Sequence, residues 1–400
     1  MRRHAEALST RTWGRASALL TAALVSLAAA AQLVAPLAAG QRTAETVASR
    51  ASAARNAGRL EEAVALYKEG VAARPDWAEG LWFLGASLYE LTRYSEAREA
   101  FTRLLRQQPD HAGAFGMRGI CAFHLQDHEN ALRDLLRSRA LGIAQTPSVG
   151  ATVRYHLGIL LTRFGDFEVG HAVLSEFAPE GNESPQVIEA LGLNLLRKPI
   201  LPAEIAAADR PVVELAGRAA FAMAARRSAA AQQALDELVT RHPEMANVHY
   251  ARGVFLLAEA PDRAIADFRR ELAISPAHVS ARLQLAFEFL RRGENEAARP
   301  LAEEAARLQP HYFTTHLALG QVLFESGELL AAVAEFELAV KLAPESAQAH
   351  FVLSRAYARA GRTADAERAR EEFVRLDQLA REQRVAPHSA EEPVEPAPAK

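Results

Sequence analysis

The chain has 400 residues, a formal net charge of −3, 50% hydrophobic residues and only 7% aromatic residues. Because this charge leaves no basic excess to neutralise phosphates, it argues against a nucleic-acid partner. Charged residues of both signs make up 24% of the chain, a composition typical of helical proteins that fold in water. Cys121 is the only cysteine, so no intrachain disulfide can form and packing alone must stabilise the fold.

The first 40 residues have the pattern of a secretory signal peptide. Four arginines precede an apolar run over residues 16–39, and small residues lie within the run at 28–30 and at its end at 38–40. This order of charge and hydrophobicity is typical of an export signal. We therefore expect the remainder of the chain to lie in the periplasm or cell envelope of a bacterium. The run is also long enough to span a bilayer, so anchoring in the cytoplasmic membrane by an uncleaved segment is the alternative.

Prolines recur at a fixed interval of 34 residues. This interval joins Pro75 to Pro109, and Pro276 to Pro310 and Pro344. Such a period predicts stacked copies of one structural unit. In the best-preserved copy, residues 313–346, Gly327 marks a turn between two apolar helical patterns, and Pro344 ends the second of them.

This pattern resembles the tetratricopeptide repeat family. Its repeat has a first helix, A, with a small residue near its middle, a turn glycine, and a second helix, B, with an early alanine, an aromatic residue and a proline at its exit. In residues 44–77 the matching residues are Ala51, Gly58, Ala63, Tyr67 and Pro75. The resemblance implies an all-α fold, an α-solenoid of stacked helix-turn-helix repeats that forms a right-handed superhelix, with helix A lining a concave groove.

The regularity of the repeats suggests how the chain is organised. We expect an N-terminal repeat array at 44–197, an irregular linker at 198–211 and a C-terminal array with a capping helix at 212–383. A tail at 384–400, rich in proline and glutamate, is expected to be disordered. Because no helix B pattern follows the single helix A near Gly192, the break over Pro185 to Pro211 is either a hinge or a degenerate repeat.

Aromatic and histidine side chains on helix A are the candidates for binding a partner in the groove. Aromatic residues bury much area at a low entropy cost and so make good anchors for a peptide or a partner helix. The alternative is that some of them pack against the next repeat. The candidates are Trp82, Tyr89, Phe123, His124, Tyr155, His156, Tyr250, Phe287, Phe324 and Phe351.

Two groups of side chains that contain histidine are candidates for metal ligands. One group recurs at a single position of the repeat, at His249, His316 and His350. Equivalent positions in neighbouring repeats lie about 10 Å apart, whereas a zinc ligand lies about 2 Å from the ion, so we expect these histidines to be structural. The other group is Cys121, His124 and His128, in which we expect Cys121 to be a small buried core residue.

The sequence contains no recognised catalytic motif: neither HExxH nor a glycine-rich phosphate loop nor a GxSxG turn occurs. The Lys and Asn clamp with which some family members bind acidic C-terminal peptides is also absent. We therefore expect a non-enzymatic scaffold or assembly factor, without cofactor or metal, that binds an unidentified protein or peptide in its groove. The alternative is an accessory subunit of an envelope enzyme that presents substrate or binds glycan through the groove aromatics.

Overall fold

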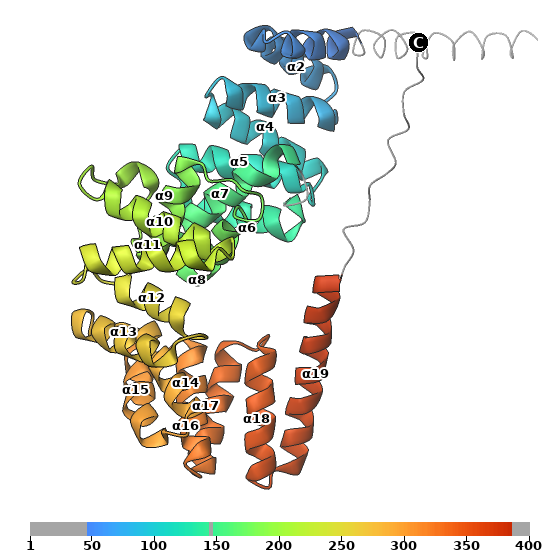
Figure 1. The fold of residues 1–400 in the computed structure, drawn as a ribbon. Coiled ribbons are helices and arrows are strands. Elements are labelled where there is room, and N and C mark those ends of the chain that lie inside the picture. Colours follow the sequence, from blue (N-terminus) through green and yellow to red (C-terminus); the bar gives the residue numbers. More distant parts are fainter. Residues whose placement is uncertain (1–45, 144–146, 386–400) are drawn as a thin grey trace, which may run out of the picture. The chain divides into compact units, whose positions relative to one another are not determined.

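The computed structural model describes residues 46–143 and 147–385, and these ranges are built from helices and turns (Figure 1). The expected signal peptide and all but the first two residues of the expected tail lie outside them. No helix within these ranges combines the length and the apolar character that crossing a membrane requires. The all-α solenoid expected from the repeat period is confirmed.

The chain divides into two compact units. Unit 1 comprises the described residues up to Glu176 together with 199–203, and unit 2 comprises 177–198 and the residues from Glu204 onward.

Unit 1 opens with a helix over residues 46–56. The helices that follow in unit 1 are α2 (Leu60–Ala73), α3 (Ala78–Glu90), α4 (Tyr94–Gln107), α5 (Ala112–His124), α6 (His128–Ala140), α7 (Pro147–Arg163) and α8 (Phe167–Ser175). Unit 2 begins with α9 (Pro185–Leu195), and a short 3₁₀ turn, η2 (Pro202–Glu204), follows α9 in the chain. The remaining helices of unit 2 are α10 (Arg210–Ala224), α11 (Ser228–Arg241), α12 (Val248–Leu256), α13 (Pro261–Ile274), α14 (Val279–Arg291), α15 (Asn295–Leu308), α16 (Phe313–Glu325), α17 (Leu329–Leu342), α18 (Ala347–Arg359) and α19 (Thr363–Val385).

In most of the helical hairpins the turn contains a residue with a left-handed backbone conformation, that is, a positive φ. Gly58, Gly293 and Gly327 have φ values of 73°, 74° and 83°, a conformation that glycine adopts without steric cost. In the α3–α4 hairpin Thr92 takes this place with a φ of 57°. The Arg93 N–H donates to the Leu88 carbonyl at 2.9 Å, which satisfies one of the carbonyls left free at the helix end.

A glycine of helix A faces an aromatic ring of helix B in several hairpins. A Cβ atom added to Gly85 would lie 2.7 Å from the Phe101 ring, and one added to Gly253 would lie 2.6 Å from the Phe268 ring. The rings of Phe101 and Phe268 are fully buried. The small residue therefore lets the two helices approach closely while the ring fills the space between them.

Helix α9 has a partner that the sequence analysis did not foresee. A Cβ atom added to Gly192 in α9 would lie 1.9 Å from the Val213 carbonyl oxygen of α10, and one added to Gly217 in α10 would lie 2.0 Å from the Ile188 carbonyl oxygen. The two backbones are thus in direct contact, so α9 packs against α10. The expectation that this helix lacks a partner was wrong, because the partner begins only at Arg210, at the end of the expected linker.

Candidate functional site

Five of the predicted partner-binding residues lie together in unit 1. Tyr89 comes from α3, Phe123 and His124 from the end of α5, and Tyr155 and His156 from α7. The His156 ring centroid lies 4.8 Å from that of Phe123, 6.0 Å from that of His124 and 5.5 Å from that of Tyr155. All five side chains are partly exposed. Three consecutive hairpins therefore contribute to one surface.

Tyr94, the first residue of α4, completes this group, and the sequence analysis did not select it. Its ring stacks on His124 with the centroids 4.3 Å apart and the planes at 8°, and it lies 5.6 Å from Tyr89. Tyr94 follows the turn residue Thr92, so it begins helix B beside the end of helix A. This position at the start of helix B could have identified Tyr94 as a candidate from the sequence. These six residues are called the aromatic–histidine cluster below.

Burial disfavours the charged forms of His124, His156 and Tyr89 in the aromatic–histidine cluster. Burial lowers the pKa of His156 to about 4, with a smaller contribution from His124 in the same direction, although the His156 Nδ1–H donates to the Thr152 carbonyl at 2.8 Å and opposes the shift. Burial also lowers the pKa of His124 and raises that of the Tyr89 hydroxyl, where Tyr94 adds to the effect. These three side chains therefore offer rings and polar edges without a formal charge.

Trp82 and Tyr250 lie outside the cluster and have similar surroundings to each other. In unit 1 the Trp82 ring stacks on His111 with the centroids 5.3 Å apart, and in unit 2 the Tyr250 ring lies 4.6 Å from that of His278. Each of these histidines precedes a helix A and caps it, since Nδ1 accepts a hydrogen bond from Ala114 N–H or Ala281 N–H at 3.1 Å. Both aromatic residues thus contact the next repeat, as the alternative interpretation allows.

The three remaining candidates lie in unit 2 and differ in exposure. Phe287 is partly buried and packs against the core of α12 to α16. Phe324 is only 5% exposed, and the guanidinium groups of Arg355 and Arg359 lie 5.3 and 4.9 Å from its ring centroid. Phe351 is 43% exposed. Of the three, Phe351 offers the most surface to a partner.

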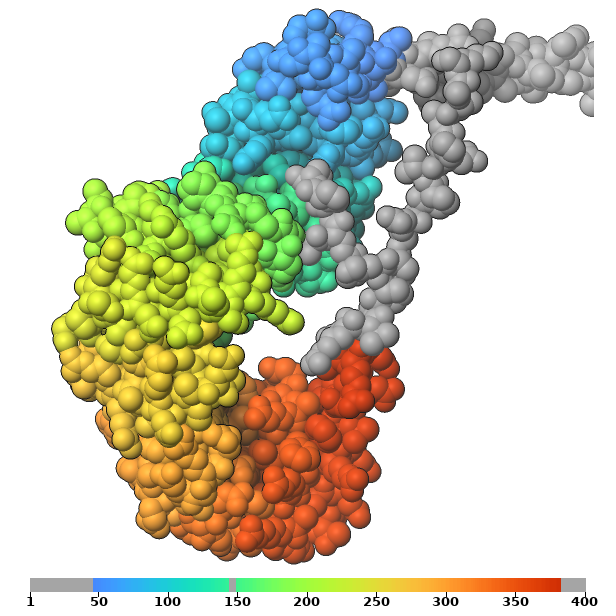
Figure 2. All heavy atoms as spheres, in the orientation of Figure 1, coloured from blue at the N-terminus to red at the C-terminus, as the bar shows by residue number. Residues whose placement is uncertain are grey.

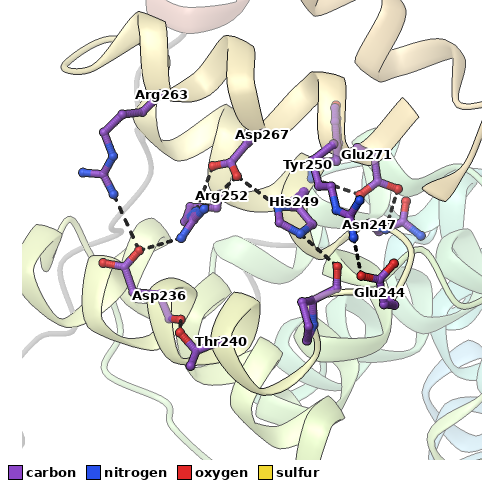
Figure 3. A network of polar contacts seen from close by, with 12 residues as sticks. Asp236, Thr240, Glu244, Asn247, His249, Tyr250, Arg252, Arg263, Asp267 and Glu271 are labelled. Atoms are coloured by element: carbon purple, nitrogen blue, oxygen red, sulfur yellow. Dashed lines mark hydrogen bonds and ion pairs between the residues drawn. The ribbon is translucent and has the colours of Figure 1, made fainter. Parts of the chain in front are cut away.

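Unit 2 also contains a buried polar network around α12 and α13 (Figure 3). Arg252 donates from Nε and Nη2 to the two oxygens of Asp267 at 2.8 and 2.7 Å, and from Nη1 to Asp236 at 3.0 Å. Asp267 is 4% exposed. Paired carboxylate and guanidinium groups at this depth are costly to separate, so the network fixes α12 on α13 and α11.

A second carboxylate of this network, Glu271, caps α12 from α13. Glu271 is fully buried, and its two oxygens accept from Asn247 N–H at 2.8 Å and from Tyr250 N–H at 3.2 Å. The first backbone N–H groups of a helix lack partners within the helix and favour a negative charge nearby. Asn247 itself has a left-handed backbone with a φ of 71°. Glu271 therefore fixes the backbone that presents Tyr250.

The repeated histidines are structural, as the sequence analysis expected. The Nε2–H groups of His249, His316 and His350 donate to the carbonyls of Pro243, Pro310 and Pro344 at 3.0, 2.9 and 3.0 Å. These are the prolines that follow the preceding helix B, so each histidine joins its helix A to the preceding repeat. Cys121 is likewise a buried core residue, and burial raises the pKa of its thiol to about 12. Within residues 46–143 and 147–385, no group of three or more His, Cys, Asp or Glu side chains is arranged to hold a metal ion.

These hairpins define the chain as a helical-repeat protein, in which each repeat buries its apolar residues against the neighbouring repeat. A family model described as tetratricopeptide repeat matches residues 48–97, 84–146, 216–279, 283–346 and 317–379. The matches cover more than half of the 400 residues, and the chain belongs to the tetratricopeptide repeat family. Members of this family bind protein partners, which supports a protein-interaction scaffold.

The solved structures that resemble the chain include those of MamA proteins. A MamA RS-1 ArsTM double mutant matches with a TM-score of 0.39 and 18% identity, over 42% of this chain and 94% of the other. MamA 41-end from Desulfovibrio magneticus RS-1 matches with a TM-score of 0.36 and 22% identity, over 41% of this chain and 92% of the other. No curated protein matches the sequence significantly.

Proposed function

We propose that the chain is a non-enzymatic scaffold or assembly factor of the bacterial periplasm or cell envelope that binds a protein or peptide partner at the aromatic–histidine cluster. The observation that carries the proposal is the convergence of Tyr89, Phe123, His124, Tyr155 and His156 from three hairpins on one partly exposed surface. Aromatic residues grouped in this way are typical of binding hot spots. The uncharged rings favour a partner that buries apolar or aromatic side chains against them.

The proposal is tested by replacing two tyrosines of the cluster with alanine. A variant with Tyr89→Ala and Tyr155→Ala is compared with the unchanged chain in chemical crosslinking and affinity capture from an envelope fraction. The partner captured by the unchanged chain should be reduced at least tenfold, because the loss of two ring contacts at a hot spot is about that large. Phe164→Ala, which removes an exposed ring of unit 1 outside the cluster, is the matched control. Undiminished capture by the double variant would contradict the assignment.

The cell-envelope location rests on the N-terminal sequence. Basic residues before an apolar run with small residues at 28–30 and 38–40 are the supporting observation. N-terminal sequencing of the chain purified from its native envelope should find a start after one of these small-residue sites. A start at Met1 in the membrane fraction would support the anchored form, and recovery from the cytoplasm would contradict export.

A glycan is the alternative ligand, bound by the chain as an accessory subunit of an envelope enzyme. The observation in its favour is that the cluster joins neutral ring faces to the hydroxyls of Tyr89, Tyr94 and Tyr155. Sedimentation with purified peptidoglycan distinguishes the two ligands. Co-sedimentation that the Tyr89→Ala and Tyr155→Ala variant loses would support the glycan, whereas capture of a protein partner alone supports the scaffold.

A further inference from the structure

The last hairpin, α18 and α19, which is coloured orange-red to red in Figure 2, has an open groove at the end of unit 2. The groove has a volume of about 580 Å³. Its lining includes Phe351, Ser354 and Arg355 of α18 and Ala366, Arg370 and Phe373 of α19. A smaller hollow of about 530 Å³ adjoins it, shares Glu367 and Arg370 and contains Val374, which is itself exposed. This surface is separate from the aromatic–histidine cluster, which belongs to unit 1.

The earlier repeats show what occupies the equivalent groove. Phe351 is the fifth residue of α18, and the fifth residues of α14 and α16 are Leu283 and Leu317. Leu283 is 5% and Leu317 is 4% exposed, against 43% for Phe351. The difference arises because α16 packs on α14 and α18 packs on α16. The following helix A thus covers the fifth residue of α14 and of α16, whereas within the described residues no helix A follows α18.

The charge around the groove shows which kind of helix it accepts. Arg362, Arg368 and Arg375 of α19 and its preceding turn each pair with a carboxylate three residues away. By contrast, within the described part of the chain no carboxylate lies within ion-pair distance of Arg355, Arg359 or Arg370. The Arg355 guanidinium lies 5.9 Å from the Phe351 ring centroid, where it flanks the apolar floor. Because Glu367 is the only acidic residue of the groove lining, the rim favours an acidic partner.

Two occupants from this chain fit less well. A second copy stacked head to tail would present the helix over residues 46–56, which contains Arg50 and Arg55 and no acidic residue, so arginines would face arginines. Residues 386–400 are acidic, but they contain four prolines, which do not fit within a helix.

We propose that the groove between α18 and α19 binds an acidic amphipathic helix of another protein, which takes the place of a next helix A and extends the array. Helix-in-groove binding of this kind buries the apolar face of the partner helix. Phe351 and Phe373, whose ring centroids lie 5.2 Å apart, form the apolar floor, and Arg355 and Arg370 pair with the acidic flanks. The interaction is independent of the partner proposed for the aromatic–histidine cluster.

The test uses the full chain and two fluorescent, stapled peptides in an anisotropy titration. Both peptides follow the 13-residue sequence of α16, which occupies the equivalent groove on α14, with glutamate at the flanking positions in one and lysine in the other. The acidic peptide should bind at least tenfold more tightly than the basic one. Phe351→Ala should weaken binding of the acidic peptide at least tenfold, and Arg355→Glu should reverse the preference between the peptides.

Controls separate this outcome from unfolding and from other occupants. Leu330→Ala removes an apolar side chain of α17 that is 79% exposed, and it should leave peptide binding unchanged. Equal binding of the two peptides, or unchanged binding by a Phe351→Ala variant with normal helix content by circular dichroism, would overturn the proposal. Displacement of the acidic peptide by a peptide of residues 386–400 would assign the groove to that segment instead. Self-association in sedimentation that Phe351→Ala abolishes would assign it to a second copy.

Discussion

His249 of unit 2 has surroundings opposite to those of His124 and His156 in unit 1. In unit 1, His124 and His156 lie among rings, and burial lowers the pKa of both. In unit 2, both ring nitrogens of His249 face oxygen acceptors, with Nδ1 3.0 Å from an Asp267 carboxylate oxygen and Nε2 3.0 Å from the Pro243 carbonyl oxygen. The His249 ring is therefore held between two oxygen atoms, one from α13 and one from the segment before α12.

The difference indicates which side chains of the repeats are available to bind a partner. Arg252, Asp267 and His249 use their polar groups to hold neighbouring helices together, so a partner would have to break these bonds in order to use them. The rings of Tyr94 and Phe123 each contact the His124 ring instead, and these contacts are not ionic. Unit 1 can therefore present these rings to a partner at little cost to its own stability.

The largest effect should follow the removal of the central carboxylate of unit 2. Asp267→Ala leaves Arg252 and His249 without their shared acceptor, and such a loss in a buried pair costs about 3 kcal/mol. Urea unfolding followed by circular dichroism measures the change. Asp236→Ala is the matched control, because Asp236 is more exposed and its loss should cost less than about 1 kcal/mol. A similar cost for both variants would show that the network is not the main stabilising contact of this region.

A second effect should be common to both units. Gly85→Ala in unit 1 and Gly253→Ala in unit 2 each place a Cβ atom within 2.7 Å of a phenylalanine ring, and each should cost about 2 kcal/mol because the ring must shift in a packed core. Thermal unfolding measures the two variants in parallel.

The chain contains a natural control for the glycine variants. The position of Gly85 is taken in α14 by Ala286, and the position of Phe101 is taken in α15 by Ala302; both alanines are fully buried. Adding Phe101→Leu to Gly85→Ala should therefore recover part of the lost stability. No recovery would mean that the cost of the alanine arises elsewhere.

A third prediction concerns the pH dependence of stability that His156 of unit 1 causes. Because the pKa of His156 falls from 6.5 to about 4 in the folded chain, the unfolded chain binds the proton first as the pH falls. The stability should therefore decrease by about 1–2 kcal/mol between pH 7 and 5, and the decrease should level off below pH 4. His156→Phe should make the dependence on pH shallower by this amount in urea titrations. If His156→Phe left the pH dependence of the free energy of unfolding unchanged, that dependence would arise from other groups.

The smallest effect should come from the turns. Thr92 in unit 1 and Arg226 in unit 2 have φ values of 57° and 56°, and a residue with a Cβ atom is strained in this region. Thr92→Gly and Arg226→Gly should each stabilise the chain by about 0.5–1 kcal/mol, since glycine relieves the strain but loses more conformational freedom on folding. Differential scanning calorimetry should detect a higher Tm for both. A lower Tm would mean that these side chains make contacts that outweigh the strain.

The sequence predicted the repeats because their signals are local. Pro310 and Pro344 mark the ends of two successive helices B, and Gly327 has the left-handed turn conformation that its place suggested. A capping helix at the end of the C-terminal array was also predicted, and the last helix, α19, has 23 residues. Each of these features depends on residues that are close in the chain.

The features that the sequence did not reveal depend on residues far apart in it. Gly192 and Gly217 pair two helices across an irregular segment, and no repeat period links them. Phe324 occupies a helix A position like that of Phe123, yet it is buried beneath Arg355 and Arg359. The exposure of a ring is decided by the side chains of the following repeat, which periodicity alone does not specify.

The histidines that precede α5 and α14 have a consequence for folding cooperativity. His278 accepts from Ala281 N–H through Nδ1, donates from Nε2 to the Asn247 side-chain oxygen at 3.0 Å and lies against the Tyr250 ring. The His278 imidazole thus caps the first helix of one repeat, α14, and also contacts the first helix of the preceding repeat, α12. When such a residue loses its place, both neighbours lose a contact at once, which strengthens the nearest-neighbour coupling of the array. Native-state hydrogen exchange should therefore find that α12 and α14 open together.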